Sequence, residues 1–232
     1  MLQIAILMGG LATRLYPITK NIPKSMIEVA GEPFIVHQLR KLSLQGIKNV
    51  VLCVGHLGSK IEPILKDGSE YGVKLKYSYD TKKLLGTGGA IKKALPLLGK
   101  EFFVLYGDSW LEINYLSVYR YFKESGCKGL MTVFKNEGKW DSSNVEIEKN
   151  KIKKYSKTKK NIRMTHIDYG LGIFNQSVFK IYADETKFDL AQVYEDLLKI
   201  GELASFEAEN RFYEIGSHEG LIELNQLLKK NK

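Results

Sequence analysis

The sequence predicts an α/β fold in which helices are layered on a mostly parallel, mixed central sheet. Strand-like and helix-like segments alternate through the first half of the chain, as they do in layered α/β proteins. Short strand-like runs dominate the second half, and 232 residues are enough to bury a substantial core. We therefore expect a single domain over residues 1–232, with 1–125 and 126–232 as its two halves.

The elements of the first half are marked by the spacing of their apolar residues. The apolar run at 4–8 predicts a buried strand, and helical spacing at 34–45 ends at Gly46, a residue favoured at C-caps. The other elements expected there are strands at 49–54, 74–79 and 102–106 and helices at 59–66, 89–97 and 114–123.

The second half is expected to be richer in strands. Lys149-Asn150-Lys151 is typical of a hairpin turn, and the sequence shows no internal repeat. The elements expected there are strands at 130–134, 145–148, 152–156 and 169–174 and helices at 190–200 and 217–229.

Composition restricts the partners and the compartment. The net charge of +9 is concentrated at 149–160 and 229–232, which indicates solvated lysines rather than a nucleic-acid surface. No apolar run reaches the roughly 18 residues of a membrane span, and no basic region precedes the first strand, so we expect neither membrane nor signal peptide. Cys53 and Cys127 suggest neither a disulfide nor a metal motif, which favours the cytoplasm.

A double glycine and two cations follow the first strand. Gly9-Gly10 lets backbone N–H groups approach a ligand, and Arg14 and Lys24 suit a multiply charged anion such as a triphosphate. The spacings of a dinucleotide fingerprint and of a P-loop are both absent. The structural alternative is a tight turn with solvated cations.

The segment after the first strand reads Gly10-Leu11-Ala12-Thr13-Arg14-Leu15, followed by Pro17, Thr19 and Pro23-Lys24. It resembles the signature of the sugar-1-phosphate nucleotidyltransferases, which is G-G-x-G-T-R-L-x-P-x-T and then P-K. The resemblance is closest to bacterial heptose- and mannose-1-phosphate guanylyltransferases. It implies a Rossmann-like, GT-A-like three-layer sandwich, with 1–125 binding the nucleotide and a β-rich 126–232 binding the acceptor. It also implies that Arg14 grips the phosphates, that Lys24 contacts the reacting phosphate, and that the nucleotide is wrapped by Met8, Gly9, Gly10, Leu11, Ala12 and Thr13.

A second glycine-rich stretch opens a helix at Gly86-Thr87-Gly88-Gly89. The resemblance implies that its backbone lines the nucleobase pocket, and guanylyl-transferring relatives carry a similar stretch, which favours GTP. Cytidylyl and uridylyl transfer stay open as alternatives. Glycines that merely begin the helix are the structural alternative.

Two carboxylates are candidate ligands of a magnesium ion. Asp108 follows a fully apolar strand, at the edge where open α/β sheets bind ligands. The resemblance implies that Asp108 binds Mg²⁺ and that Glu214 stands where the family places a second metal-binding aspartate. A helix-capping Asp108 and a strand-end Glu214 are the structural alternatives.

The acceptor is expected in the second half. By resemblance, Asn144 occupies a sugar-contacting position, Lys157 binds the sugar phosphate, and Tyr169-Gly170 belongs to the glycine-centred sugar loop. Ser156 replaces the glutamate that usually holds sugar hydroxyls, which leaves both sugar and non-sugar phosphates open.

The implied reaction is attack of a sugar 1-phosphate on the α-phosphorus of a nucleoside triphosphate, giving a nucleotide sugar for cell-surface polysaccharide synthesis and pyrophosphate. The attacking phosphate is already anionic, so positioning and charge neutralisation suffice without a serine or cysteine nucleophile. A non-catalytic nucleotide-sensing homologue is the alternative of another class. A glycosyltransferase is disfavoured because Gly107-Asp108-Ser109 lacks a second aspartate, and a homo-oligomer is left open.

Overall fold

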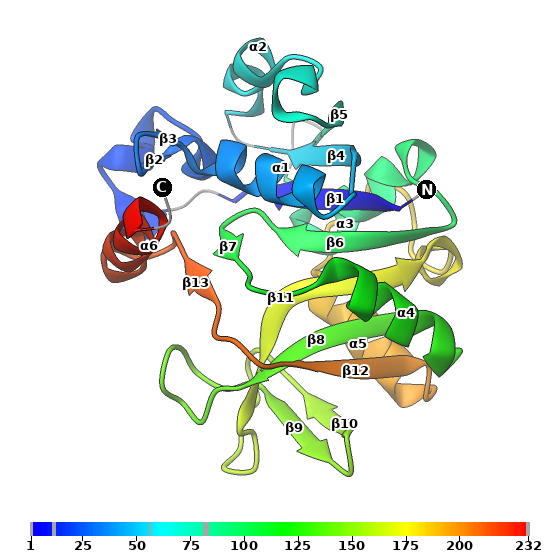
Figure 1. The fold of residues 1–232 in the computed structure, drawn as a ribbon. Helices are drawn as coiled ribbons and strands as arrows, with labels where there is room; N and C mark the ends of the chain where they lie inside the picture. The colour runs from blue at the N-terminus through cyan, green and yellow to red at the C-terminus, as the bar shows by residue number, and fades with distance from the viewer. Residues whose placement is uncertain (1, 11–12, 56, 81–83, 231–232) are drawn as a thin grey trace.

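A nine-stranded sheet forms the centre of the computed structural model, which describes residues 2–10, 13–55, 57–80 and 84–230 (Figure 1). Its strands run in the order β10-β9-β11-β6-β1-β4-β5, and β8 and β12 continue it beside β11. Four neighbouring strands are parallel: β6 (Glu101–Tyr106), β1 (Gln3–Met8), β4 (Asn49–Val54) and β5 (Lys74–Tyr79).

The strands of the second half join the same sheet. β11 (His166–Asn175) runs antiparallel to β6, and β8 (Gly129–Lys135) runs antiparallel to β11. The remaining strands there are β9 (Val145–Glu148), β10 (Lys151–Tyr155) and β12 (Leu203–Ala208). The two halves therefore share one sheet rather than forming two stacked sheets.

Helices cover both faces of the sheet. α1 (Phe34–Leu44) and α4 (Tyr115–Ser125) lie on the face towards the viewer in Figure 1, and α3 (Gly86–Ala94) and α5 (Leu190–Lys199) lie behind it. The alternation of side chains along the strands separates two cores: Ile4 and Ile6 pack on the α1 face, whereas Ala5 packs on the α3 face. The predicted three-layer, Rossmann-like α/β sandwich is confirmed.

The C-terminal helix α6 (His218–Lys230) forms a small third core with Phe34 and Trp110. Ala30 N donates to Asn225 Oδ1 at 2.8 Å, which ties this helix to the N-terminal half. The short strands beside it are β2 (Glu28–Val29), β3 (Glu32–Pro33), β7 (Ser109–Trp110) and β13 (Tyr213–Glu214).

Most predicted elements have their expected places, but two helices differ, and the two-residue strands β2, β3, β7 and β13 were not predicted. The helix predicted at 89–97 begins at Gly86 and changes to a 3₁₀ turn after Ala94. The helix predicted at 59–66 is a 3₁₀ turn followed by the short α2 (Glu62–Leu65), and β12 was not predicted. The 3₁₀ helices are η1 (Thr13–Leu15), η2 (Ile18–Lys20), η3 (Lys24–Met26), η4 (Gly58–Lys60), η5 (Ser69–Tyr71), η6 (Leu95–Leu97) and η7 (Gln176–Phe179).

The predicted hairpin is confirmed, since Lys149 and Asn150 join β9 to β10 with φ of 48° and 59°, as a tight turn between twisted strands requires. Among the described residues, no helix has both the length and the apolar character needed to cross a membrane.

Candidate active site

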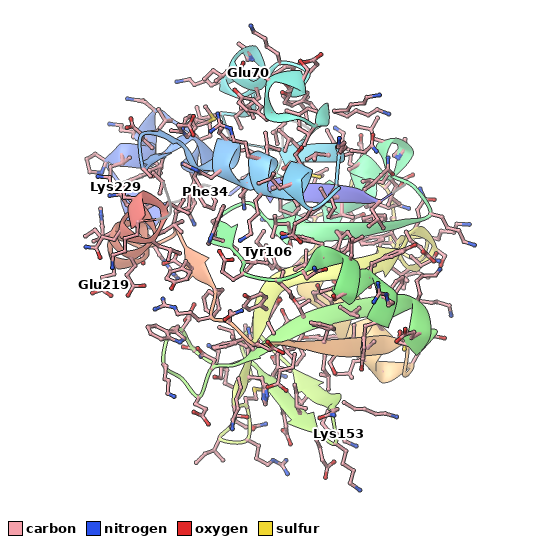
Figure 2. The ribbon with its side chains drawn as sticks, in the orientation of Figure 1. Phe34, Glu70, Tyr106, Lys153, Glu219 and Lys229 are labelled. Carbon is pink, nitrogen blue, oxygen red and sulfur yellow. The ribbon has the colours of Figure 1, made fainter. Side chains whose placement is uncertain are left out.

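A pocket of about 440 Å³ opens at the carboxyl ends of the parallel strands. Tyr106, labelled near the middle of the molecule in Figure 2, lies at the end of β6 and forms part of its wall. This edge is where ligands bind in open α/β sheets. The pocket is lined by Leu7, Met8, Gly9, Gly10, Lys24, Ser25, Asp80, Leu84, Gly86, Thr87, Ala90, Tyr106, Gly107, Asp108 and Lys187.

Glycines that follow β4 and β6 allow neighbouring strand ends to approach the first loop and β1 closely. A Cβ added at Gly55, after β4, would lie 2.8 Å from Gly9 Cα, and one at Gly107, after β6, would lie 2.5 Å from Leu7 O. Neither Gly9 nor Gly10 has a positive φ, and a Cβ at Gly9 would lie at an ordinary contact distance of 3.6 Å from Gly55, so close approach explains Gly55 and Gly107 rather than Gly9. The predicted residues Met8, Gly9 and Gly10 all line the pocket.

Lys24 and Asp108 meet inside this pocket. Lys24, at the start of η3, places its Nζ 2.6 Å from Asp108 Oδ2, although 84 residues separate them in sequence. Their side chains are 20% and 39% exposed, so a ligand can reach both charges. The predicted cation and the predicted carboxylate are therefore neighbours.

Glu214 is brought to the same place by strand pairing. β13 pairs with β7 so that Glu214 lies opposite Ser109, and Ile215 N donates to Asp108 O at 3.0 Å. A side chain at Gly216 would collide with both the Glu214 carboxylate and the Lys24 amine. The carboxylate of Glu214 accepts hydrogen bonds from Gly216 N and Ser217 Oγ.

This donor set fits a magnesium ion. Two carboxylates from adjoining strands provide hard oxygen ligands, and phosphate oxygens and water would complete the coordination of an ion held by Asp108 and Glu214. The Lys24 amine neutralises the Asp108 carboxylate where the metal ion would bind, so a positive charge is favoured beside Asp108. The hydrogen bonds of Glu214 to the start of α6 would have to adjust.

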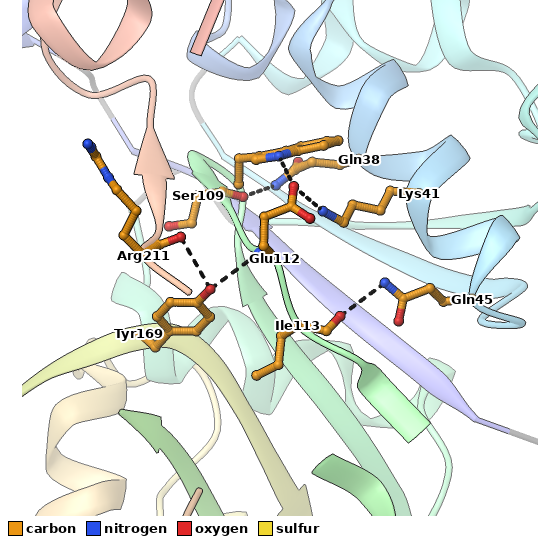
Figure 3. Close-up of polar contacts among 9 residues, drawn as sticks. Gln38, Lys41, Gln45, Ser109, Glu112, Ile113, Tyr169 and Arg211 are labelled. Atoms are coloured by element: carbon orange, nitrogen blue, oxygen red, sulfur yellow. Dashed lines mark hydrogen bonds and ion pairs between the residues drawn. The ribbon is translucent and has the colours of Figure 1, made fainter. Parts of the chain in front are cut away.

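Helix α1 holds the segment that carries Asp108 (Figure 3). Gln38 Nε2 donates to Ser109 O at 2.8 Å, and Gln45 Nε2 donates to Ile113 O at 3.0 Å. Between them, Lys41 Nζ lies 2.8 Å from Glu112 Oε1. Two polar contacts from α1 and one from Gln45 directly after it therefore fix this segment after the strand, which positions Asp108.

The glycine-rich opening of α3 serves two purposes. Gly86 and Thr87 line the pocket. Gly88 and Gly89 instead donate their N–H groups to Phe188 O, at 3.0 and 3.3 Å, and are not among the lining residues. A Cβ at Gly88 would strike the Phe188 ring, so close packing against the loop before α5 explains this glycine.

The predicted acceptor residues cluster at the far end of Tyr106. Lys157 Nζ lies 2.8 Å from Asp189 Oδ1 and 5.8 Å from the centre of the Tyr106 ring. Gly170, at a φ of 97°, places its Cα against Ser109, where a side chain would approach Ser109 Oγ to 3.0 Å. Asn144 Oδ1 accepts a hydrogen bond from the backbone N–H of Asp168 at 2.9 Å and so holds the backbone two residues before Gly170.

The Tyr169 side chain is part of the hydrophobic core. Its ring is 1% exposed, packs against Phe134 and Phe212, and belongs to the core on the α1 face. Its hydroxyl accepts from Glu112 N at 3.2 Å and lies 3.5 Å from Arg211 O (Figure 3). Contact of Tyr169 with an acceptor thus stays a prediction that the position of its side chain does not support.

The structure describes the rest of the predicted phosphate loop only in part. Leu11 and Ala12 lie outside the described residues, as does the side chain of Thr13. Arg14, on η1, is exposed and is not among the residues that line the pocket.

Sequence reasoning missed several residues of the site. Asp80 follows β5 directly, and the rule that strand ends carry ligand-binding groups could have identified it. Lys187 and Asp189 come from the loop before α5, where the sequence carries no motif.

Comparison with known proteins agrees with this geometry. The model of a family described as nucleotidyl transferase matches residues 4–231. The D-glycero-alpha-D-manno-heptose 1-phosphate guanylyltransferase of Campylobacter jejuni is 32% identical over 215 residues, covering 93% of this chain and 95% of that protein. The mannose-1-phosphate guanyltransferase of Aspergillus oryzae is 28% identical, covering 99% of this chain and 66% of that protein.

A solved structure shows the same fold. HddC of Yersinia pseudotuberculosis, in complex with GMP-PN, superposes with a TM-score of 0.81 at 22% identity, covering 99% of this chain and all of that protein. The family match extends over both halves of the sheet and includes the pocket at its carboxyl edge. This chain therefore belongs to the nucleotidyl transferase family.

Proposed function

We propose that this protein is a guanylyltransferase that joins GTP to a sugar 1-phosphate, a heptose or a hexose, and releases pyrophosphate. The observation that carries the proposal is the ion pair of Lys24 and Asp108 in a pocket lined by Gly9-Gly10, with Glu214 brought beside it by the pairing of β13 with β7. The names of the relatives support GTP and sugar 1-phosphates as the substrates. The product would serve cell-surface polysaccharide synthesis in the cytoplasm, which suits the two free cysteines.

In this reaction an acceptor phosphate oxygen forms a bond to the α-phosphorus, and the bond from that phosphorus to the bridging oxygen of the β-phosphate breaks. Lys24 would neutralise charge on the triphosphate, and Lys157 would hold the acceptor phosphate in competition with Asp189. Mg²⁺ on Asp108 and Glu214 would withdraw charge from the phosphate oxygens when bound. The two anions would have to be held in line for this attack, and the end of β6, where Tyr106 lies near Lys157 and Asp108 follows, would position them.

The proposal is tested by pairing each of the four ribonucleoside triphosphates with heptose, mannose and glucose 1-phosphates, with and without Mg²⁺. We expect Mg²⁺-dependent pyrophosphate release to be fastest with GTP, and a GDP-sugar to form in equal amount. Faster turnover with another triphosphate would contradict the choice of base. Binding of GTP without pyrophosphate release from any pair would instead favour a nucleotide-sensing protein.

A further inference from the structure

The order of the strands spreads the pocket residues along one edge of the sheet. Asp108, Gly9, Gly55 and Asp80 follow β6, β1, β4 and β5, which are neighbours in that order. Adjacent strands lie about 4.8 Å apart, so the backbone of β5 is about 14 Å from that of β6 along this edge, and the Asp80 side chain extends from β5 back over Gly55 and Gly9. If the phosphates bind at Lys24 and Asp108, as the proposed function requires, the base at the other end of the nucleotide would extend towards Asp80, which lines the same pocket.

The carboxylate of Asp80 is held in a fixed position. Asp80 N donates to Val54 O at 2.9 Å, and Asp80 Oδ2 accepts from Leu85 N at 3.3 Å. A Cβ at Gly55 would come within 3.2 Å of this oxygen and one at Gly9 within 3.7 Å, so the carboxylate lies over two glycines.

The surroundings of Asp80 call for hydrogen-bond donors from a ligand. Burial raises the pKa of Asp80, although the hydrogen bond from the Leu85 N–H and the charge of Lys93 both act to lower it. Lys24 neutralises Asp108 at 2.6 Å, whereas no ion pair to Asp80 is found among the described residues, so Asp80 would repel phosphates and does not serve the triphosphate. The apolar side chains of Leu84 and Ala90 line the same pocket and suit the faces of a ring.

Guanine is the base whose hydrogen-bonding edge matches a carboxylate. Its N1–H and its 2-amino group are adjacent donors, which two carboxylate oxygens can accept side by side. Adenine and cytosine place an acceptor nitrogen beside their amino group, and uracil flanks its single N–H with carbonyls, so each would set an acceptor against Asp80. We infer that Asp80 is the specificity-determining residue of this site and that its carboxylate accepts the N1–H and 2-amino protons of guanine.

This inference rests on the proposed function, and its test compares GTP with ITP, which lacks the 2-amino group. We expect wild-type protein to favour GTP over ITP by at least about tenfold in kcat/KM, since a site built around a donor rejects an analogue that lacks it. Asp80→Asn, whose amide offers one acceptor, should lower kcat/KM for GTP by about tenfold or more and reduce the GTP-to-ITP ratio towards one. The KM of the sugar phosphate at saturating GTP should not change.

Glu70→Gln is the matched control, because it removes a carboxylate that is exposed and far from Tyr106 in Figure 2. An unchanged GTP-to-ITP ratio in Asp80→Asn would overturn the inference, and so would an equal loss for all four triphosphates, which would point to ribose contact. A wild-type preference for a base other than guanine would instead overturn the proposed function.

A second measurement uses wild-type protein alone and does not depend on how the variant folds. Calorimetric titration with GTP, ITP and 1-methyl-GTP should show weaker binding for both analogues, each by about tenfold. Equal affinity for the three triphosphates would overturn the inference.

Discussion

At the scale of single residues, Asp168 is the carboxyl group whose titration the fold changes most clearly. Its Oδ1 accepts from Gly170 N at 3.0 Å, and it lies near the charges of Lys157 and Asp189. Burial raises the pKa of Asp168 to about 6, which the Gly170 N–H and Lys157 oppose. The folded protein therefore keeps a proton on this carboxyl at pH values where the unfolded chain has lost it.

The Asp168→Asn variant tests this environment. The pKa of Asp168 is higher in the folded state, so its ionisation lowers the stability of the fold. This loss of stability is absent below about pH 4, grows as the pH rises towards about 6, and has its full size at higher pH. We expect the amide, which can still accept from Gly170 N, to raise the free energy of unfolding at pH 7.5 by up to about 3 kcal/mol. Urea unfolding at pH 4.5 and 7.5 measures this, and an equal difference at both pH values would contradict it.

The sequence predicted individual residues only where a motif existed. Lys24 and Asp108 belong to recognisable stretches, and they form an ion pair. Asp80 is a single carboxylate at the end of an edge strand, and its role depends on the order of strands in the sheet. Tyr169 stands beside Gly170 in sequence, but alternation along β11 directs its ring into the core.

At the scale of elements, the start of α3 is joined to the loop before α5 by close packing. The Gly88→Ala variant should push the Phe188 ring out of its place and lower the free energy of unfolding by about 1–3 kcal/mol. Moving this loop also displaces Lys187 and should raise the KM for GTP.

The double variant Gly88→Ala/Phe188→Leu provides the control, since the smaller side chain relieves the collision. Urea midpoints of the two single variants and the double variant give the coupling between the positions. Strict additivity would show that Gly88 is needed for some reason other than this contact.

Elements with strong patterns were predictable, and short or half-buried ones were not. The strands at 49–54, 74–79 and 145–148 have the predicted bounds. β12 is half-buried along most of its length and shows no clean alternation. The two-residue strands β7 and β13 exist only because the chain returns from far away to pair them, and that pairing is what places Glu214 beside Asp108.

At the scale of the whole molecule, the two halves share one sheet, because β11 pairs directly with β6. We expect both halves to unfold together in a single transition. Trp110 and Trp140 report one half each, so single-tryptophan variants, Trp140→Phe and Trp110→Phe, allow the halves to be followed separately. In each variant the fluorescence and circular dichroism midpoints in urea should coincide, and separated midpoints would indicate two folding units.

The most direct test of whether this pocket transfers nucleotides is the rate of pyrophosphate release from GTP and a sugar 1-phosphate. The rate is measured for Asp108→Asn and Lys24→Gln and compared with wild type and Glu70→Gln. Removing either charge at the reacting phosphates should lower kcat by at least about 100-fold, while circular dichroism stays that of wild type. Glu70→Gln should retain the wild-type rate. Wild-type turnover by Asp108→Asn would contradict the account.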